Sequence, residues 1–138
     1  MMTVKVVSSV QEIFTTTEAK EVYAPTSAGI VGILSDHTNY IAPLEIGILR
    51  IKYSVTGNNG NDIEQQIVLN GGIIQVMDNE VLVLADEATK TEEIIRSEVD
   101  QAVKNAQRKL AAPLEPEELI KLEKLLRYEK FKQEHISS

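Results

Sequence analysis

Cysteine and tryptophan are both absent from this chain of 138 residues, and aromatic residues make up only 4% of it. Without cysteine, the chain has no disulfide, no thiolate metal site and no cysteine nucleophile. Its two histidines, His37 and His135, leave little for metal binding. The sequence therefore predicts neither a metal site nor a cofactor.

Long hydrophobic runs are also missing, since none approaches the roughly 18 to 20 uncharged residues that a membrane-spanning helix needs. Residues 1–5 lead directly into a strand-like pattern, without the apolar core of a signal peptide. We expect the chain to work where it is made, in a bacterial cytoplasm or in an organelle that encodes it.

Basic residues are in the minority, and the formal net charge is -7. Residues 1–90 hold 11 acidic and 5 basic residues, whereas residues 91–138 hold 10 and 9. An acidic body repels phosphate backbones, so no nucleic-acid partner is expected. The acidic clusters near residues 86, 92 and 115 fit helix ends and solvated faces, and no spacing indicates paired-carboxylate catalysis.

The first two thirds of the chain consist of short runs rich in β-branched residues, separated by glycine, proline, asparagine and aspartate. Such runs at this spacing predict a β-sandwich or barrel. Residues 56–62 and 78–80 are expected to be hairpin turns, because they are rich in residues that tolerate turn dihedrals. The predicted strands are residues 4–7, 12–16, 21–24, 48–53, 63–69 and 81–84.

After Ala88 the apolar period changes from two to about 3.6 residues, which indicates helix. Residues 89–92 (Thr-Lys-Thr-Glu) form a candidate capping box. Pro113 and Pro116 end the first helix and open a second, which stops near residues 132–135. The apolar positions are Ile95, Val99, Ala102, Val103, Ala106 and Leu110 in the first helix, and Leu119, Leu122, Leu125 and Leu126 in the second.

Two helices joined by a short link predict an antiparallel hairpin. The fold class is therefore α+β, with an N-terminal antiparallel β-sandwich over residues 1–88 and a C-terminal antiparallel two-helix hairpin over residues 89–138. Because the hairpin stripe is rich in alanine, it loses little apolar burial on opening. Both a movable appendage and a fixed hairpin agree with this pattern.

The glycines of the first part favour a structural interpretation. Gly29 and Gly32 lack the lysine and serine that follow a phosphate-binding loop, so we expect turns and close strand approach instead. Gly71 and Gly72 are expected at a bulge or bend between strands. His37 lacks any arrangement typical of a nucleophilic triad, so we expect no catalysis there and a hydrogen bond that fixes the turn instead.

Four ordered motifs carry a family resemblance. They are P-T-x-x-G-x-x-G-I-L-x-x-H in residues 25–37, L-x-x-G-x-x-x-I in residues 44–51, G-G-x-x-x-V in residues 71–76 and V-x-V-L-A-x-x-A in residues 81–88. This order resembles the epsilon subunit of F-type ATP synthases, called delta in mitochondria. The resemblance covers residues 3–88 by motif and the remaining tail by helical character and length.

The resemblance implies a non-catalytic rotor subunit in the central stalk of a proton-translocating ATP synthase. Its sandwich would bind the shaft (gamma) subunit and the membrane c-ring, and its helices would restrain wasteful ATP hydrolysis by contacting the catalytic alpha and beta subunits. The chain would then lie peripheral to a bacterial plasma membrane or a thylakoid membrane, facing cytoplasm or stroma. It would meet the membrane only through the complex.

Particular residues follow from the same resemblance. The c-ring and shaft side would include Gly29, Ile30, Val31, Gly32 and His37. In the second helix, basic residues form a positive face that is either simply solvated or docks against an acidic segment of the catalytic subunits. The candidate inhibitory contacts are Lys121, Lys124, Arg127 and Lys130.

The chain departs from its relatives in several places. An ATP-binding helix motif of some bacterial relatives, I/L-D-x-x-R-A, is broken here by Val103 and Lys104. His37 is not followed by the usual H-x-P, and Ile30 stands where some relatives have an acid. The competing interpretation is a free-standing small-molecule-binding sandwich with a helical lid, although scarce aromatics and convergent polar groups speak against it.

Overall fold

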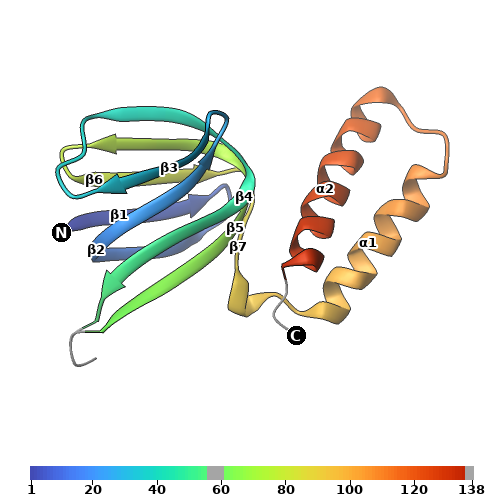
Figure 1. Cartoon of the computed structure of the whole chain (residues 1–138). Coiled ribbons are helices and arrows are strands. Elements are labelled where there is room, and N and C mark those ends of the chain that lie inside the picture. The colour runs from blue at the N-terminus through green and yellow to red at the C-terminus, as the bar shows by residue number, and fades with distance from the viewer. Residues whose placement is uncertain (56–60, 136–138) are drawn as a thin grey trace. The chain divides into compact units, whose positions relative to one another are not determined.

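The computed structural model describes residues 1–55 and 61–135. The chain divides into two compact units, Met1–Lys90 and Thr91–Ser138. The first unit is built from strands and the second from helices (Figure 1). The predicted fold class, a β-sandwich followed by a two-helix hairpin, is confirmed.

The strand unit contains more and longer strands than the sequence predicted. The two short strands predicted in residues 12–26 form one continuous strand, and the segments at 29–34 and 88–90 are strands that the prediction missed. The predicted tip at 56–62 lies mostly outside the described residues. The strands are β1 (Met2–Ser8), β2 (Glu12–Thr26), β3 (Gly29–Leu34), β4 (Tyr40–Ser54), β5 (Asp62–Met77), β6 (Glu80–Ala85) and β7 (Ala88–Lys90).

Strand pairing closes the sheet on itself. The hydrogen-bonded order is β1-β6-β5-β4-β2-β3, with β7 on β5 and an additional pairing between β1 and β2. Among the described strands the pairings are antiparallel except for β1 with β6, which is parallel. Because β2 pairs with β1 up to Ala19 and with β4 from Ala19 onward, it passes from one layer to the other.

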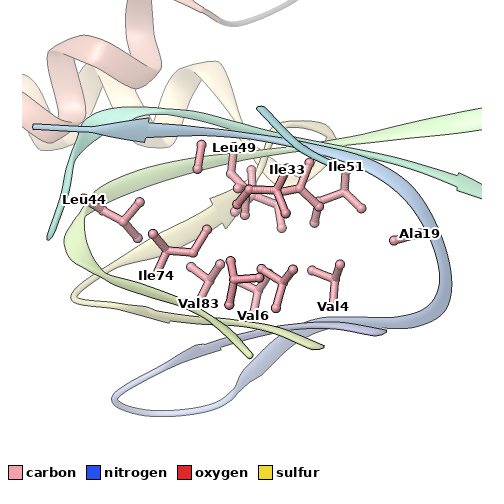
Figure 2. Close-up of a cluster of buried hydrophobic side chains, with 14 of the residues drawn as sticks. Val4, Val6, Ala19, Ile33, Leu44, Leu49, Ile51, Ile74 and Val83 are labelled. Atoms are coloured by element: carbon pink, nitrogen blue, oxygen red, sulfur yellow. The ribbon is translucent and has the colours of Figure 1, made fainter. Parts of the chain in front are cut away.

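The core lies between the two layers and is made of aliphatic side chains. In β1 the residues at every second position, Met2, Val4 and Val6, are fully buried, which is the period of a strand with one inward face. Figure 2 shows Val4, Val6, Ile33, Leu49, Ile74 and Val83 gathered between the strands. Burying each such side chain contributes about 1.5–3 kcal/mol.

The glycine pair at 71–72 forms a bend, as the sequence predicted, but the bend lies within β5 and not between two strands. Both residues have positive φ, +80° and +131°. A Cβ on Gly72 would lie 2.1 Å from the carbonyl oxygen of Leu84, so only glycine fits there. The pair marks the point where β5 leaves β7, with which it pairs at Ile67 to Leu69, and joins β6.

The helical unit begins with a short 3₁₀ turn (Thr91–Glu93), followed by α1 (Arg96–Leu110) and α2 (Pro116–Glu134). The predicted capping box is wrong, because residues 88–90 pair with β5 and α1 starts only after Ile95, whose side chain makes no cap bond. Pro116 stands in the first turn of α2 as predicted. Neither helix in the described part of the chain is long and apolar enough to cross a membrane.

The two helices bury different amounts of their predicted apolar stripes. In α1, Val99, Val103 and Ala106 are buried, whereas Ile95 lies before the helix and is 52% exposed. In α2 the predicted leucine stripe is only partly covered, with Leu119 and Leu125 exposed. The buried residues of α2 are instead Tyr128 and Glu129.

Candidate interaction surfaces

The segment that carried the first glycine motif forms a turn and an edge strand. The hydroxyl of Thr26 donates to the carbonyl oxygen of Gly29 at 2.6 Å and accepts from the amide of Ala28 at 3.2 Å. Gly29 has φ +110°, which favours glycine. Its partner Gly32 lies inside β3 with ordinary φ, and an added Cβ there would stand 3.1 Å from the ring of Tyr23.

Strand β3 presents one apolar face outward. Val31 is half-buried and Ile33 is fully buried. On the other face of the strand, Ile30 is 79% exposed and Leu34 is 53% exposed. Among the described strands, β3 pairs with β2 alone. An edge strand without charged side chains is a place where a partner can add to the sheet or cover it.

His37 follows β3 in the link to β4 and takes part in local contacts. Its amide donates to the carbonyl oxygen of Leu34 at 3.1 Å, and its Nδ1 lies 2.7 Å from the carbonyl oxygen of Thr38. The imidazole meets the ring of Tyr40 edge-on, with centroids 6.0 Å apart. The structure therefore places His37 in a turn-fixing position that leaves the ring half-exposed.

Asn79, which the sequence singled out only as part of a turn, holds this link in place. Its Oδ1 accepts from the amide of Asp36 at 2.9 Å, and its Nδ2 donates to the carbonyl oxygen of Met1 at 2.7 Å. Asp78 and Asn79 have φ +49° and +63°, as in a two-residue hairpin turn. One side chain thus ties the β5–β6 turn to the His37 link and to the start of β1.

The outward face of β4, β5 and β6 carries an apolar patch that the sequence analysis missed. Pro43 pairs with Ile73, and Ile73 pairs with Leu84, so their side chains lie side by side on one face. Ile41, Ile73 and Leu84 are 67%, 47% and 48% exposed. We call Ile41, Pro43, Ile73, Met77 and Leu84 the outer patch.

Two open hollows border the outer patch. One, of about 430 Å³, is lined by Ile73, Leu84 and Asp86 among others. The second, of about 290 Å³, lies beside Tyr40 and Ile41. Contiguous exposed apolar surface with such relief is typical of a protein interface. The runs of adjacent apolar residues in β5 and β6 carried the signal, because strands with both faces apolar have both faces covered.

The four basic candidates on α2 are exposed, but they do not form a single stripe. The spacing is three residues from each to the next, in the order Lys121, Lys124, Arg127 and Lys130. Three residues of an α-helix fall about 60° short of a full turn, so each side chain points about 60° away from the one before it. They therefore wind over about half of the helix circumference. Lys132 differs, because its Nζ lies 3.1 Å from Glu129 and 4.7 Å from the centroid of the Tyr128 ring.

The helix segment that resembles a broken nucleotide motif is occupied by contacts within the hairpin. The Asp100 carboxylate accepts a hydrogen bond from Nε2 of Gln133 at 2.7 Å. Val103 is 6% exposed and offers no polar group, while Lys104 points to solvent. The position of the motif's arginine is therefore occupied by the apolar side chain of Val103, and Asp100 is engaged by Gln133.

Comparison with known proteins shows which family this chain resembles in sequence. Residues 1–91 match the family model described as "ATP synthase, Delta/Epsilon chain, beta-sandwich domain". The ATP synthase epsilon chain of Thioalkalivibrio sulfidiphilus (strain HL-EbGR7) is 36% identical over 108 residues, which cover 78% of this chain and 72% of the relative. The chloroplastic ATP synthase epsilon chain of Pelargonium hortorum is 33% identical over 90 residues, or 65% and 63% of the two chains.

Two solved structures share the fold. A chain of the Euglena gracilis mitochondrial ATP synthase, determined as OSCP/F1/c-ring, aligns with a TM-score of 0.69 and 24% identity over 94% of this chain and 77% of that one. A chain of the Tetrahymena thermophila mitochondrial ATP synthase, determined as central stalk and c-ring, aligns with a TM-score of 0.60 and 17% identity over 96% of both. At these identities the likeness shows the fold.

Proposed function

Because this chain belongs to the ATP synthase delta/epsilon chain family, we propose that it is the central-stalk subunit that joins the shaft subunit to the membrane c-ring. In this role the sandwich is the anchor, and it turns with the rotor. The observation that carries the proposal is the outer patch, since exposed apolar residues grouped on one sheet face are typical of a protein interface.

Two surfaces of the sandwich suit two partners. The outer patch lies on the face of a sheet and fits a broad, pre-formed surface such as that of the shaft subunit. The turn and edge strand at Gly29, Ile30, Val31 and Gly32, together with His37, offer a narrower contact that suits the loops of a c-ring. We assign the shaft to the outer patch and the ring to the Gly29–His37 side.

The same proposal makes the chain a non-catalytic subunit. His37 is engaged with Thr38 and Tyr40, which supports a structural part for it. The catalytic alpha and beta subunits would meet this chain only through the helices, and contact with the membrane would be indirect. The complex would lie on the cytoplasmic face of a bacterial membrane or on the stromal face of a thylakoid membrane.

Restraint of wasteful ATP hydrolysis is assigned to the helical hairpin. The exposed cations Lys121, Lys124, Arg127 and Lys130 would approach acidic surface of the catalytic subunits. Because these charges wind around α2, they favour approach from several directions and speed encounter more than they tighten binding. Exposed Leu119 and Leu125 on the same helix supply apolar surface for the contact itself.

The competing function, a small-molecule-binding sandwich, receives less support. The interior between the layers is filled by aliphatic side chains that are fully buried, including Ile33, Leu49 and Ile74 (Figure 2). The two hollows that border the exposed outer patch are open to solvent. We therefore prefer the protein-partner function.

The test is ATP hydrolysis by a head complex that lacks this subunit, titrated with the full chain and with a version ending at Lys90. Binding and rate are both measured. We expect both versions to bind the shaft at micromolar concentration or tighter, and only the full chain to slow hydrolysis. Failure of both versions to bind would refute the proposed function, while binding without inhibition would refute the regulatory part alone.

The apolar patch is tested in the same assay. Ile73→Ser removes apolar surface from the outward face, so we expect weaker binding to the shaft. Thr15→Ser lies on the exposed part of β2 outside the patch and serves as the control. Equal binding by the two variants would place the shaft elsewhere.

A further inference from the structure

A side-chain hydrogen bond between Asp100 and Gln133 joins α1 to α2 toward the end of the hairpin opposite its connection. Asp100 lies near the start of α1, Gln133 near the end of α2, and residues 111–115 join the two helices at the opposite end (Figure 1). Nε2 of Gln133 donates to Oδ1 of Asp100 at 2.7 Å in a partly buried setting. This bond lies where the helices would first separate.

The inner face of α2 changes character along its length. Leu126, Glu129 and Gln133 are spaced by three and four residues, so they lie on one face of the helix. Toward the connection that face carries leucine, and toward the free end it carries polar groups. Glu129 is only 8% exposed, and its carboxylate pairs with Lys132 at 3.1 Å.

Apolar packing of the hairpin is thin. The buried side chains of α1 are small, two valines and one alanine; α2 adds one large buried side chain, Tyr128, while Leu119 and Leu125 in the same helix are 39% and 37% exposed. Apart from Tyr128, few apolar groups are removed from water when the helices close. A well-formed hydrogen bond between the helices therefore makes up a sizeable part of the closing free energy.

We propose that the Asp100–Gln133 hydrogen bond is a latch that sets the ratio of closed to separated helices. The latch is supplied by the chain itself, through one residue on each helix. Its regulatory meaning rests on the proposed inhibitory function, because a hairpin that separates more readily offers α2 to the catalytic subunits more often. The latch itself is a property of the chain alone.

The experiment measures the distance between the helices in the full chain. Because the chain has no cysteine, Glu98→Cys and Lys130→Cys introduce two exposed labelling sites, one on each helix, for electron-spin distance measurement. Gln133→Ala removes the donor of the latch. The matched control is Gln101→Ala, which removes the hydrogen bond from Gln101 to Asn105 at 2.9 Å within α1.

We expect Gln133→Ala to raise the ratio of separated to closed helices by about 3- to 10-fold, the effect of losing one partly buried hydrogen bond. Gln101→Ala should keep the parent distribution. Asp100→Ala should act like Gln133→Ala, and the double variant should add no further change, since both substitutions remove the same bond. If the two latch variants resemble the parent, or if their effects add, the latch is refuted.

A loss of helix in Gln133→Ala is recognised by circular dichroism. In that case the latch is tested by comparing Asp100→Asn with Asp100→Ala, because asparagine keeps the oxygen that accepts the hydrogen bond and alanine does not. The proposal requires the parent distribution for Asp100→Asn and a shift for Asp100→Ala; the same distribution for both contradicts it. Since no head complex is present, a negative result here is distinct from failure of the inhibitory function.

Discussion

Asn79 offers the sharpest test of how the sandwich holds its His37 link. Substitution with alanine removes two side-chain hydrogen bonds, to the Asp36 amide and to the Met1 carbonyl oxygen. At an exposed turn the two together contribute about 1–2 kcal/mol, at the lower end of the range for hydrogen bonds. Alanine at φ +63° adds about 1–2 kcal/mol of backbone strain, which asparagine tolerates better.

We therefore expect Asn79→Ala to lower the free energy of unfolding of the sandwich by about 2–4 kcal/mol. Glycine accepts the left-handed conformation, so Asn79→Gly isolates the loss of the side chain. It should cost about 1–2 kcal/mol from the hydrogen bonds, plus a smaller term because glycine is freer in the unfolded chain. The order parent, glycine, alanine is the signature of the two separate causes.

Urea unfolding gives these free energies, and amide hydrogen exchange locates the change. The amide of Asp36 donates to Asn79, so both variants should accelerate its exchange, while the amide of buried Ile51 should follow only global unfolding. Asn105→Ala, on α1, is the control for a surface asparagine. Unchanged Asp36 exchange in a variant that is as stable as the parent would refute the reasoning.

Three further outcomes are expected. Ile73→Ser should leave the stability of the sandwich within about 1 kcal/mol, whereas Ile74→Ser, fully buried on the opposite face of β5, should cost about 3–5 kcal/mol by urea unfolding. Equal effects would mean that the faces are wrongly assigned. Lys132→Met leaves the buried Glu129 without its partner at 3.1 Å, and should lower helix stability by about 1–3 kcal/mol in thermal melts followed at 222 nm. Millimolar ATP should leave the thermal midpoint unchanged, because Asp100 is engaged by Gln133, and a rise of several degrees would contradict this.

Strands with clean alternation could be predicted from the sequence, and so could the family. In β1 and β6 one face is buried and the pattern is regular, and the four ordered motifs identified the family that the comparisons confirm. Strand β3 was missed because two of its six residues are glycine, which is depleted in strands. Gly32 is in β3 because it lies against the ring of Tyr23, a contact between strands that composition does not reveal.

Hydrogen bonds between residues far apart in the sequence could not be predicted. Asn79 meets Asp36 over 43 positions and Met1 over 78, and only the closed pairing of the strands brings them together. The outer patch was not predicted, for a different reason. Ile73 and Ile74 lie in none of the predicted strands, and the sequence alone does not tell which of two adjacent apolar residues faces outward. Apolar surface on both faces of a strand indicates that a partner outside this chain covers the outward face.

The two units differ in how they are held together, and this difference supports the division of work that we propose. In the sandwich β1 pairs with both β2 and β6, so the strand that closes the sheet cannot separate without breaking pairings on both of its sides. The hairpin consists of two helices, with half-exposed leucines in α2 and the Asp100–Gln133 hydrogen bond near its free end. Elements that move in regulation come from the least stable part of a structure. A rotor connection must instead resist opening under load, and only the closed sandwich is built to do so.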